Sequence, residues 1–150
     1  MIATSTTYDL VLIIHIVAAL DTLIVFIVMR SAGQAIARGA DESVQRKRFP
    51  NRRNWAARVF HLLPITGLIM SLSGDKSVAL SKPWIGVGIL CYLAMAGHLE
   101  ARTLPQERSL AAAIEADGVV PPESGRAFVK SLDVLLAIFG VALLTMLIQY

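Results

Sequence analysis

Charged residues are scarce in this chain: they make up 17% of its 150 residues, whereas 55% are hydrophobic. A soluble domain usually carries about 25% charged residues. The composition therefore excludes an ordinary water-soluble domain, and the mean hydropathy of +0.62 agrees with that conclusion. Cysteine is almost absent, since only Cys91 is present and it lies inside an apolar run. A single cysteine excludes both an intramolecular disulfide framework and a metal site built from several thiolates.

The hydrophobic residues are concentrated in four long apolar segments. Each has about 20 residues, the length that an α-helix needs to cross a hydrocarbon core of ~30 Å. Because the segments are continuously apolar rather than alternating, they predict helices and not the strands of a membrane barrel. We therefore predict an all-α membrane fold in which residues 1–150 form a single integral membrane domain. The predicted spans are residues 8–29, 56–73, 84–101 and 127–149.

Basic residues are distributed unevenly among the connections between these spans. Lysine and arginine resist translocation, so connections rich in them remain in the cytoplasm. The first and third connections with their edges hold twelve basic residues, whereas the second holds only Lys76 and Lys82. The twelve are Arg30, Arg38, Arg46, Lys47, Arg48, Arg52, Arg53, Arg58, Arg102, Arg108, Arg126 and Lys130. We expect a four-transmembrane-helix antiparallel bundle, multi-pass in a bacterial-type inner (plasma) membrane, with the N-terminus and the C-terminus outside. The N-terminal MIATSTTYD lacks the basic region and cleavage site of a signal peptide, so the first span is expected to be retained.

Local signals refine the connections and the second span. In the third connection Thr103 can cap a helix, Gln106 lies at the capping-box position and Gly118 can end the helix. We therefore expect a short cytoplasmic surface helix there. In the second span Pro64 predicts a kink, and Thr66 can satisfy a carbonyl that the proline leaves free.

The first connection ends in a basic cluster, RKRFPNRRNW. Basic residues beside a membrane are attracted to anionic lipid, at about 1 kcal/mol each. We expect the cluster to contact lipid headgroups, and we expect no nucleic-acid binding because a stacking platform is lacking. The expected headgroup contacts are Arg46, Lys47, Arg48, Arg52, Arg53 and Trp55.

A few ionisable residues fall within or near the spans, where each needs a partner or a use. His61, His98 and Asp133 are predicted to lie at a similar depth on three helices. This set can ligate a metal ion, and His61 and His98 can hold a haem axially, because neutral imidazole serves both roles. The cofactor is not determined by the sequence, and haem b is one possibility. The alternative is structural: His61 pairs with Asp133, and His98 caps backbone carbonyls or meets headgroups.

Asp21 lies near the middle of the first span, six residues after His15. That spacing places the two side chains about 120° apart around a helix, too divergent for a direct pair. One interpretation gives Asp21 hydrogen bonds to hydroxyl groups, and the candidates are Thr22, Thr66 and Ser71. The other makes it a desolvated carboxyl group in a proton relay.

Small residues are frequent in the third and fourth spans, where they allow helix backbones to approach closely. Gly97 and Ala101 form a small-xxx-small pair. The other members of the set are Gly86, Gly88, Ala94, Ala96, Ala137, Gly140 and Ala142. These surfaces predict packing against other integral membrane subunits or in a homo-oligomer, with membrane lipids around them.

The segments LPITGLIMSLSG and KPWIGVGILCYLAMAGHLEARTLPQERSLAAA, with His15, resemble an uncharacterised bacterial family of predicted four-helix integral membrane proteins. The chain is also distantly similar to the copper resistance protein D and protoporphyrinogen oxidase membrane families. In those families a histidine in the first span serves a haem or a metal. The resemblance implies that His15 would be the ligand here, beside His61 and His98.

Three functional hypotheses follow. The leading one is a small non-catalytic accessory subunit of a larger inner-membrane complex, plausibly respiratory. The second is a haem- or metal-binding membrane redox protein that uses His15, His61 and His98. The third is a small proton-coupled transporter or channel centred on Asp21.

Overall fold

The computed structural model describes residues 2–73 and 82–148, with side chains from Thr6 onward, and all of its regular elements there are helical. In chain order they are α1 (Ile2–Ala37), α2 (Glu42–Arg48), the 3-10 helix η1 (Ala56–His61), α3 (Leu62–Ser73), α4 (Pro83–His98), the π-helical turn η3 (Leu99–Thr103), α5 (Leu104–Asp117) and α6 (Pro122–Leu147). The predicted turn around Lys76, and the last predicted residue of the fourth span, lie outside the described residues.

Four of the helical segments are long and apolar enough to cross a membrane, which confirms the predicted all-helical membrane composition. They are Thr6–Ala37, Ala56–Ser73, Pro83–Asp117 and Pro122–Leu147. The second has the predicted bounds, whereas the first and third continue well beyond the predicted ends at residues 29 and 101. The apolar sequence thus marks the spans, but the helices extend past them.

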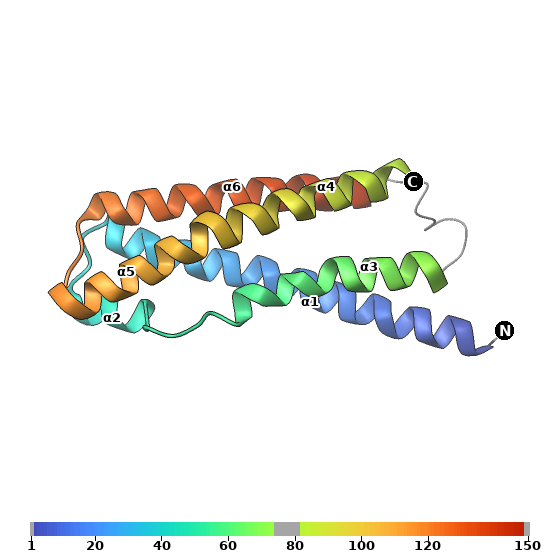
Figure 1. Ribbon diagram of the computed structural model, residues 1–150, viewed down its shortest axis with the longest axis horizontal. Helices are drawn as coiled ribbons and strands as arrows, with labels where there is room; N and C mark the ends of the chain where they lie inside the picture. The colour runs from blue at the N-terminus through green and yellow to red at the C-terminus, as the bar shows by residue number, and fades with distance from the viewer. Residues whose placement is uncertain (1, 74–81, 149–150) are drawn as a thin grey trace.

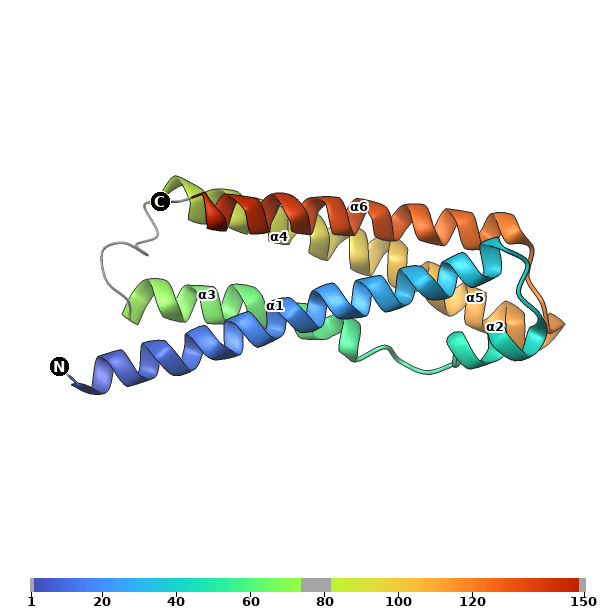
Figure 2. The same cartoon turned by 180° about the vertical axis from the view of Figure 1, so that it is seen from behind.

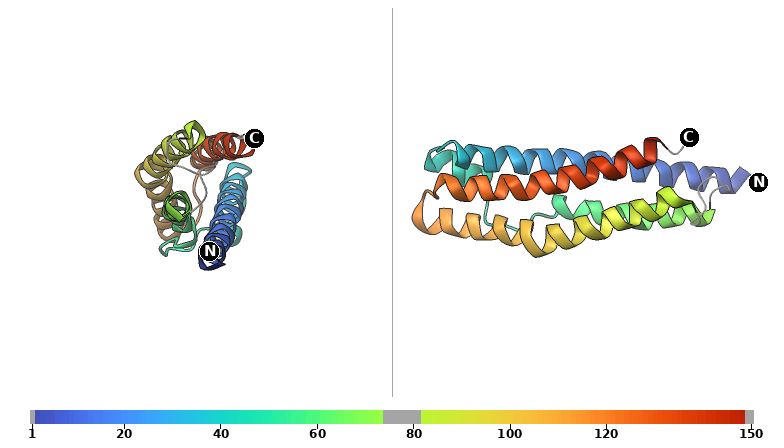
Figure 3. Two further views of the ribbon diagram at one scale, coloured as in Figure 1. Left: turned by 90° about the vertical axis from the view of Figure 1, so that its right-hand side faces the viewer. Right: turned by 90° about the horizontal axis from the view of Figure 1, so that it is seen from above.

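The long helices lie side by side along the long axis of the molecule (Figures 1 and 2). Both chain ends lie at one end of the molecule, which we call the apolar end; α2 and α5 lie at the other, which we call the polar end. Helix α1 packs along both α3 and α6, and α4 packs along α6. No comparable packing joins α3 to α4 among the described residues. The end-on view in Figure 3 shows this arrangement, with α6 between α1 and α4.

Helices α1 and α6 cross at two glycines. A Cβ atom added to Gly125 would lie 2.5 Å from the backbone nitrogen of Ala37 and 2.7 Å from the carbonyl oxygen of Gly33. A Cβ atom added to Gly33 would lie 2.9 Å from the ring of Phe128. These distances are too short for any side chain, so the two backbones touch at this crossing. Close backbone approach of this kind is how small residues hold membrane helices together.

The polar end has a compact core of its own. Phe49, Phe128, Ile36 and Ile114 are buried there, and the rings of Phe49 and Phe128 meet edge to face at 5.5 Å. The fully buried side chain of Gln45 donates to the carbonyl of Ala40 and accepts from the backbone N–H of Val120. A buried amide with both ends satisfied fixes the position of α2 against the two connecting loops.

Helix termini at the polar end follow local sequence signals. Asp41 caps α2 by accepting from the N–H of Val44 at 3.0 Å, and this bond, with a second from Ser43, holds the pKa of Asp41 below its usual value. Gly118 ends α5 with a φ of 81°, a left-handed conformation suited to glycine, as predicted.

The predicted cap at Thr103 is wrong. Thr103 has helical dihedral angles, makes no capping bond and is fully buried, because α4, η3 and α5 form one continuous helix. The expected separate helix of the third connection is thus a continuation of the third span through a π-helical turn. In the second span, the 3-10 helix η1 gives way to α3 just before Pro64, and the Thr66 hydroxyl donates to the carbonyl of Leu62 at 2.7 Å.

We predict that Gly125→Ala destabilises the fold by about 1–3 kcal/mol, because the added methyl group must push α1 and α6 apart. The control is Gly140→Ala on the same helix, where an added Cβ meets no atom within 4 Å. Thermal unfolding of the purified proteins in one detergent would compare them. Equal midpoints for the two variants would show that the crossing does not hold the helices together.

Candidate functional site

Ionisable side chains gather where the helices pass from their apolar segments to the polar end. We call this set the polar layer. It consists of Arg30 on α1, Arg58 and His61 on η1, His98 on α4, Glu100 on η3 and Asp133 on α6. The set includes the three residues that the sequence predicts at similar depth, together with Arg30, Arg58 and Glu100.

One cluster in the layer is centred on Glu100. Its carboxylate accepts two hydrogen bonds from Arg58, from Nε and a terminal nitrogen, both at 3.1 Å. The Nε2 atom of His61 lies 3.6 Å from the same carboxylate, and its Nδ1 atom lies 2.9 Å from the hydroxyl of Tyr92. A phenol, an imidazole and a carboxylate are thus aligned between η1 and the α4–η3 helix. Such a row can hold the two helices together or pass a proton along it.

A second polar network joins α4 to α6. His98 Nε2 lies 3.1 Å from the carbonyl oxygen and 3.0 Å from the hydroxyl of Ser131, whose hydroxyl also meets that of Thr103 at 2.8 Å. Ser131 and Thr103 are buried, so their hydroxyl groups need these partners. The expectation that His98 meets a backbone carbonyl is confirmed, although the carbonyl belongs to another helix.

The third contact is an ion pair between Arg30 Nε and Asp133, which ties α1 to α6. The structural alternative paired Asp133 with His61, and this is wrong, because Asp133 pairs with Arg30. Within the described part of the chain, no three side chains of His, Cys, Asp or Glu lie close enough together to share a metal ion. His61, His98 and Asp133 thus belong to three separate contacts at a similar depth.

His15 is not part of this layer and lies against α3. Its Nδ1 atom is 2.7 Å from the Thr66 hydroxyl oxygen, and its ring lies 3.7 Å from where a Cβ of Gly67 would be. Because the Thr66 hydroxyl donates its only proton to the carbonyl of Leu62, the imidazole is the donor in the first contact. The structure therefore places His15, His61 and His98 at three different helix contacts.

Asp21 differs from the histidines, because one carboxylate oxygen, Oδ2, is buried without a hydrogen-bond partner in the described structure. Two of the three expected hydroxyl partners are occupied elsewhere: Thr22 donates to the carbonyl of Ala18, and Thr66 donates within α3. A buried unpaired oxygen is unfavourable for an ionised carboxyl group in an apolar segment. Among the described residues, Asp21 shares this feature with Gln106, whose Oε1 atom is also buried without a partner, but Asp21 alone of the two is ionisable.

The basic cluster of the first connection is partly bound within the protein. Arg46 pairs with Glu42 and reaches the carbonyl of Glu115, and Arg48 donates to Ser31. The indole of Trp55 is 65% exposed, with the guanidinium groups of Arg53 and Arg58 at 5.9 and 5.8 Å from its ring. Headgroup contact by these residues stays a prediction, with Lys47, Arg52 and Trp55 the members of the cluster that remain most available for it.

Sequence reasoning missed Glu100 and Tyr92 as partners of His61, and Arg30 as the partner of Asp133. Arg30 and Asp133 are the innermost charges of their helices apart from Asp21, which is a signal that could have paired them. No comparable signal indicated Glu100, because its contacts depend on the rotation of the helix at η3.

We predict that Glu100→Gln lowers stability by about 1 kcal/mol, because Arg58 loses its counter-charge while remaining partly buried. The control is Glu123→Gln, whose exposed pair with Arg126 at 3.9 Å should contribute little. Thermal unfolding in detergent measures both variants. A midpoint for Glu100→Gln no lower than that of the control would contradict the central place given to Glu100.

Comparison of the chain with protein-family models, curated proteins and solved structures finds no match. The resemblance stated from the sequence therefore stays a prediction. The function has to be argued from the geometry of the helices and their polar groups.

Proposed function

We propose that this chain is a small non-catalytic subunit of a larger assembly in a bacterial-type inner membrane, plausibly a respiratory one. In this proposal the four apolar segments form an antiparallel bundle across the bilayer. The polar end lies in the cytoplasm, as the distribution of basic residues favours, and both termini lie outside. Helix α1 has 36 residues, about 54 Å, so it crosses a ~30 Å core and extends beyond it on the polar side.

One face of α4 carries this proposal. Gly86, Leu90, Ala94 and Gly97 recur at helical spacing on α4, Ala101 continues the row on η3, and all five are exposed. A Cβ atom added to Gly86 or Gly97 would meet nothing within 4 Å. At the α1–α6 crossing, by contrast, atoms of the neighbouring helix occupy the space beside the small residues. Small residues let membrane helices approach closely, so the empty α4 face suits a helix from another subunit.

The histidines also support a non-catalytic role, because each is accounted for by a helix contact. His15 bonds to Thr66, His61 lies between Tyr92 and Glu100, and His98 bonds to Ser131. His61 has a contact at each of its ring nitrogens, so it could bind a haem iron only in exchange for one of them. The haem alternative is tested by an absorption spectrum of protein purified gently from the native membrane, in which a Soret band would support it.

We predict that Gly97→Leu reduces recovery of partner subunits at least about tenfold in crosslinking and co-purification from native membranes, because leucine blocks close approach at the α4 face. Its stability should be nearly unchanged, since no described atom lies within 4 Å of a Cβ atom added to Gly97. Gly140→Leu is the matched control on α6, also open around its Cβ position. Equal recovery from wild type and Gly97→Leu would remove α4 as the interface. Loss only with Gly140→Leu would move the interface to α6.

A second candidate, a proton-coupled transporter, is favoured by the buried unpaired oxygen of Asp21. Carboxyl groups within apolar helices serve as proton carriers in membrane pumps and transporters, and Asp21 is such a group. A homo-oligomer fits this candidate best, because four helices alone offer little room for a pore.

We predict, for this second candidate, that Asp21→Asn abolishes proton movement into liposomes reconstituted with the protein, because the amide cannot carry a proton in exchange. Entrapped pH-sensitive dye gives the measurement. Glu123→Gln, the same change at an exposed residue outside the apolar segments, is the control and should leave the flux unaltered. Flux that survives Asp21→Asn, or no flux from wild type, would eliminate the transporter.

A further inference from the structure

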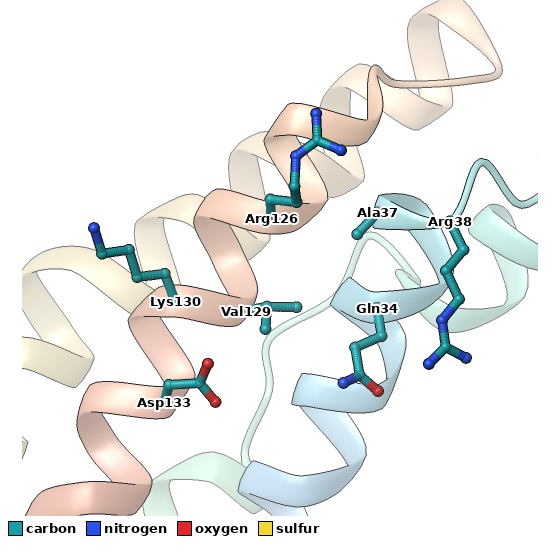
Figure 4. A pocket seen from close by; sticks show the side chains of 7 residues that line it. All are labelled: Gln34, Ala37, Arg38, Arg126, Val129, Lys130 and Asp133. Atoms are coloured by element: carbon teal, nitrogen blue, oxygen red, sulfur yellow. The ribbon is translucent and has the colours of Figure 1, made fainter.

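A groove lies between α1 and α6 directly beside the crossing of the two helices. It has a volume of about 200 Å³. Gln34 and Arg38 line it from the α1 side, and Arg126, Lys130 and Asp133 line it from α6. Figure 4 shows Gln34 and Asp133 at the space between the two helices, whereas Arg126 extends above it and the side chains of Lys130 and Arg38 extend outward from the far sides of α6 and α1. We call it the α1–α6 groove.

The groove carries positive charge that the protein does not neutralise. Asp133 is already paired with Arg30, so its charge is balanced. Arg126 has only a 3.9 Å contact with Glu123, and its side chain is 65% exposed. Arg38 and Lys130 have no side-chain hydrogen bond or ion pair to any described residue. Three cations around one groove, none firmly held, are free to turn toward an anion.

The depth of the groove matches that of lipid headgroups, given the membrane placement proposed above. The headgroup layer is about 5–8 Å thick on each side of the hydrocarbon core. Gln34 lies five residues beyond Met29, the last apolar residue of the first predicted span, which is about 7 Å along the helix. On α6, Lys130 lies within the predicted span of residues 127–149, four residues, or about 6 Å, before the uncharged run that begins at Val134.

The same face of α6 also offers a surface for an acyl chain. From Lys130 and Asp133, steps of three or four residues lead to Ala137, Val141 and Leu144, and all three are exposed. A cationic groove at headgroup depth thus continues into an apolar strip at hydrocarbon depth. A free anion would use only the first part, whereas a phospholipid would use both.

We propose that the α1–α6 groove binds the phosphate group of an anionic phospholipid, with an acyl chain lying along α6. Arginine and lysine supply charge to the phosphate oxygens, and the Gln34 amide supplies a neutral donor. The site is distinct from the basic cluster of the first connection, in which Arg46 and Arg48 already have partners within the protein. It rests on the membrane placement in the proposed function but not on the partner-binding role.

The test uses the full-length purified protein in detergent, titrated with phosphatidylglycerol, and reads bound lipid by native mass spectrometry. The double variant Arg126→Gln/Lys130→Gln should bind at least about tenfold more weakly. Lys47→Gln/Arg52→Gln removes the same charge elsewhere and should bind as wild type does. Arg38→Gln, from the α1 side, should weaken binding independently, and thermal unfolding without lipid checks that each variant is folded.

Two further titrations distinguish a phospholipid headgroup from free phosphate as the bound group. Phosphatidylcholine, which has no net charge, should bind much more weakly than phosphatidylglycerol, and inorganic phosphate at equal concentration should not compete. Equal weakening by both double variants would reveal diffuse charge attraction and overturn the proposal. Competition by inorganic phosphate would overturn the lipid assignment. None of these readouts involves a partner subunit, so failure here is distinguishable from failure of the α4 interface.

Discussion

The contact between the α1 and α6 backbones at Gly33 and Gly125 is the constraint on which the rest of the molecule depends. With no room for a Cβ atom at Gly125, the two helices lie at their closest distance there. Arg30 can then reach Asp133, and Phe128 can pack beneath α1 and against Phe49. The basic side chains that follow on each helix are brought to the two sides of one groove. One close crossing thus sets the ion pair, the core of the polar end and the proposed lipid site.

The polar layer shows how a chain with few charges distributes them. Leaving a charged group unpaired in an apolar environment is very unfavourable, whereas pairing it between helices also fixes their positions. Glu100 joins η1 to the third span, Asp133 joins α6 to α1, and Ser131 joins α6 to α4. The side chains of the two ion pairs stay partly exposed, so these pairs form without full desolvation, whereas the Ser131 contact is buried. Asp21 is the exception because it lies deep in α1 with an unpaired oxygen.

Sequence length and hydropathy were sufficient to predict the four apolar helices, because a bilayer imposes one length on any helix that crosses it. Gly118 was predictable as a helix end because a left-handed residue favours glycine. The partners of the histidines were not predictable, since depth follows from residue number but the direction of a side chain follows from helix rotation. His61 and Asp133 share a depth and still point to different neighbours. Thr103 misled because a hydroxyl residue before proline looks like a cap, and the π-helical turn that buries it leaves no trace in composition.

Gly33 and Gly125 lie outside the predicted spans of residues 8–29 and 127–149, so the predicted packing residues, which follow the spans, include Gly86 and Gly97 but not these two. In the structure the two groups differ in what they face. Gly125 faces a backbone, whereas a Cβ atom added to Gly86 or Gly97 meets no described atom within 4 Å. A glycine that faces lipid gains no hydrophobic stabilisation over a larger apolar residue, and it weakens a helix by about 1 kcal/mol relative to alanine. A row of small residues without a partner is therefore disadvantageous to an isolated bundle, and it becomes advantageous once another helix packs against α4.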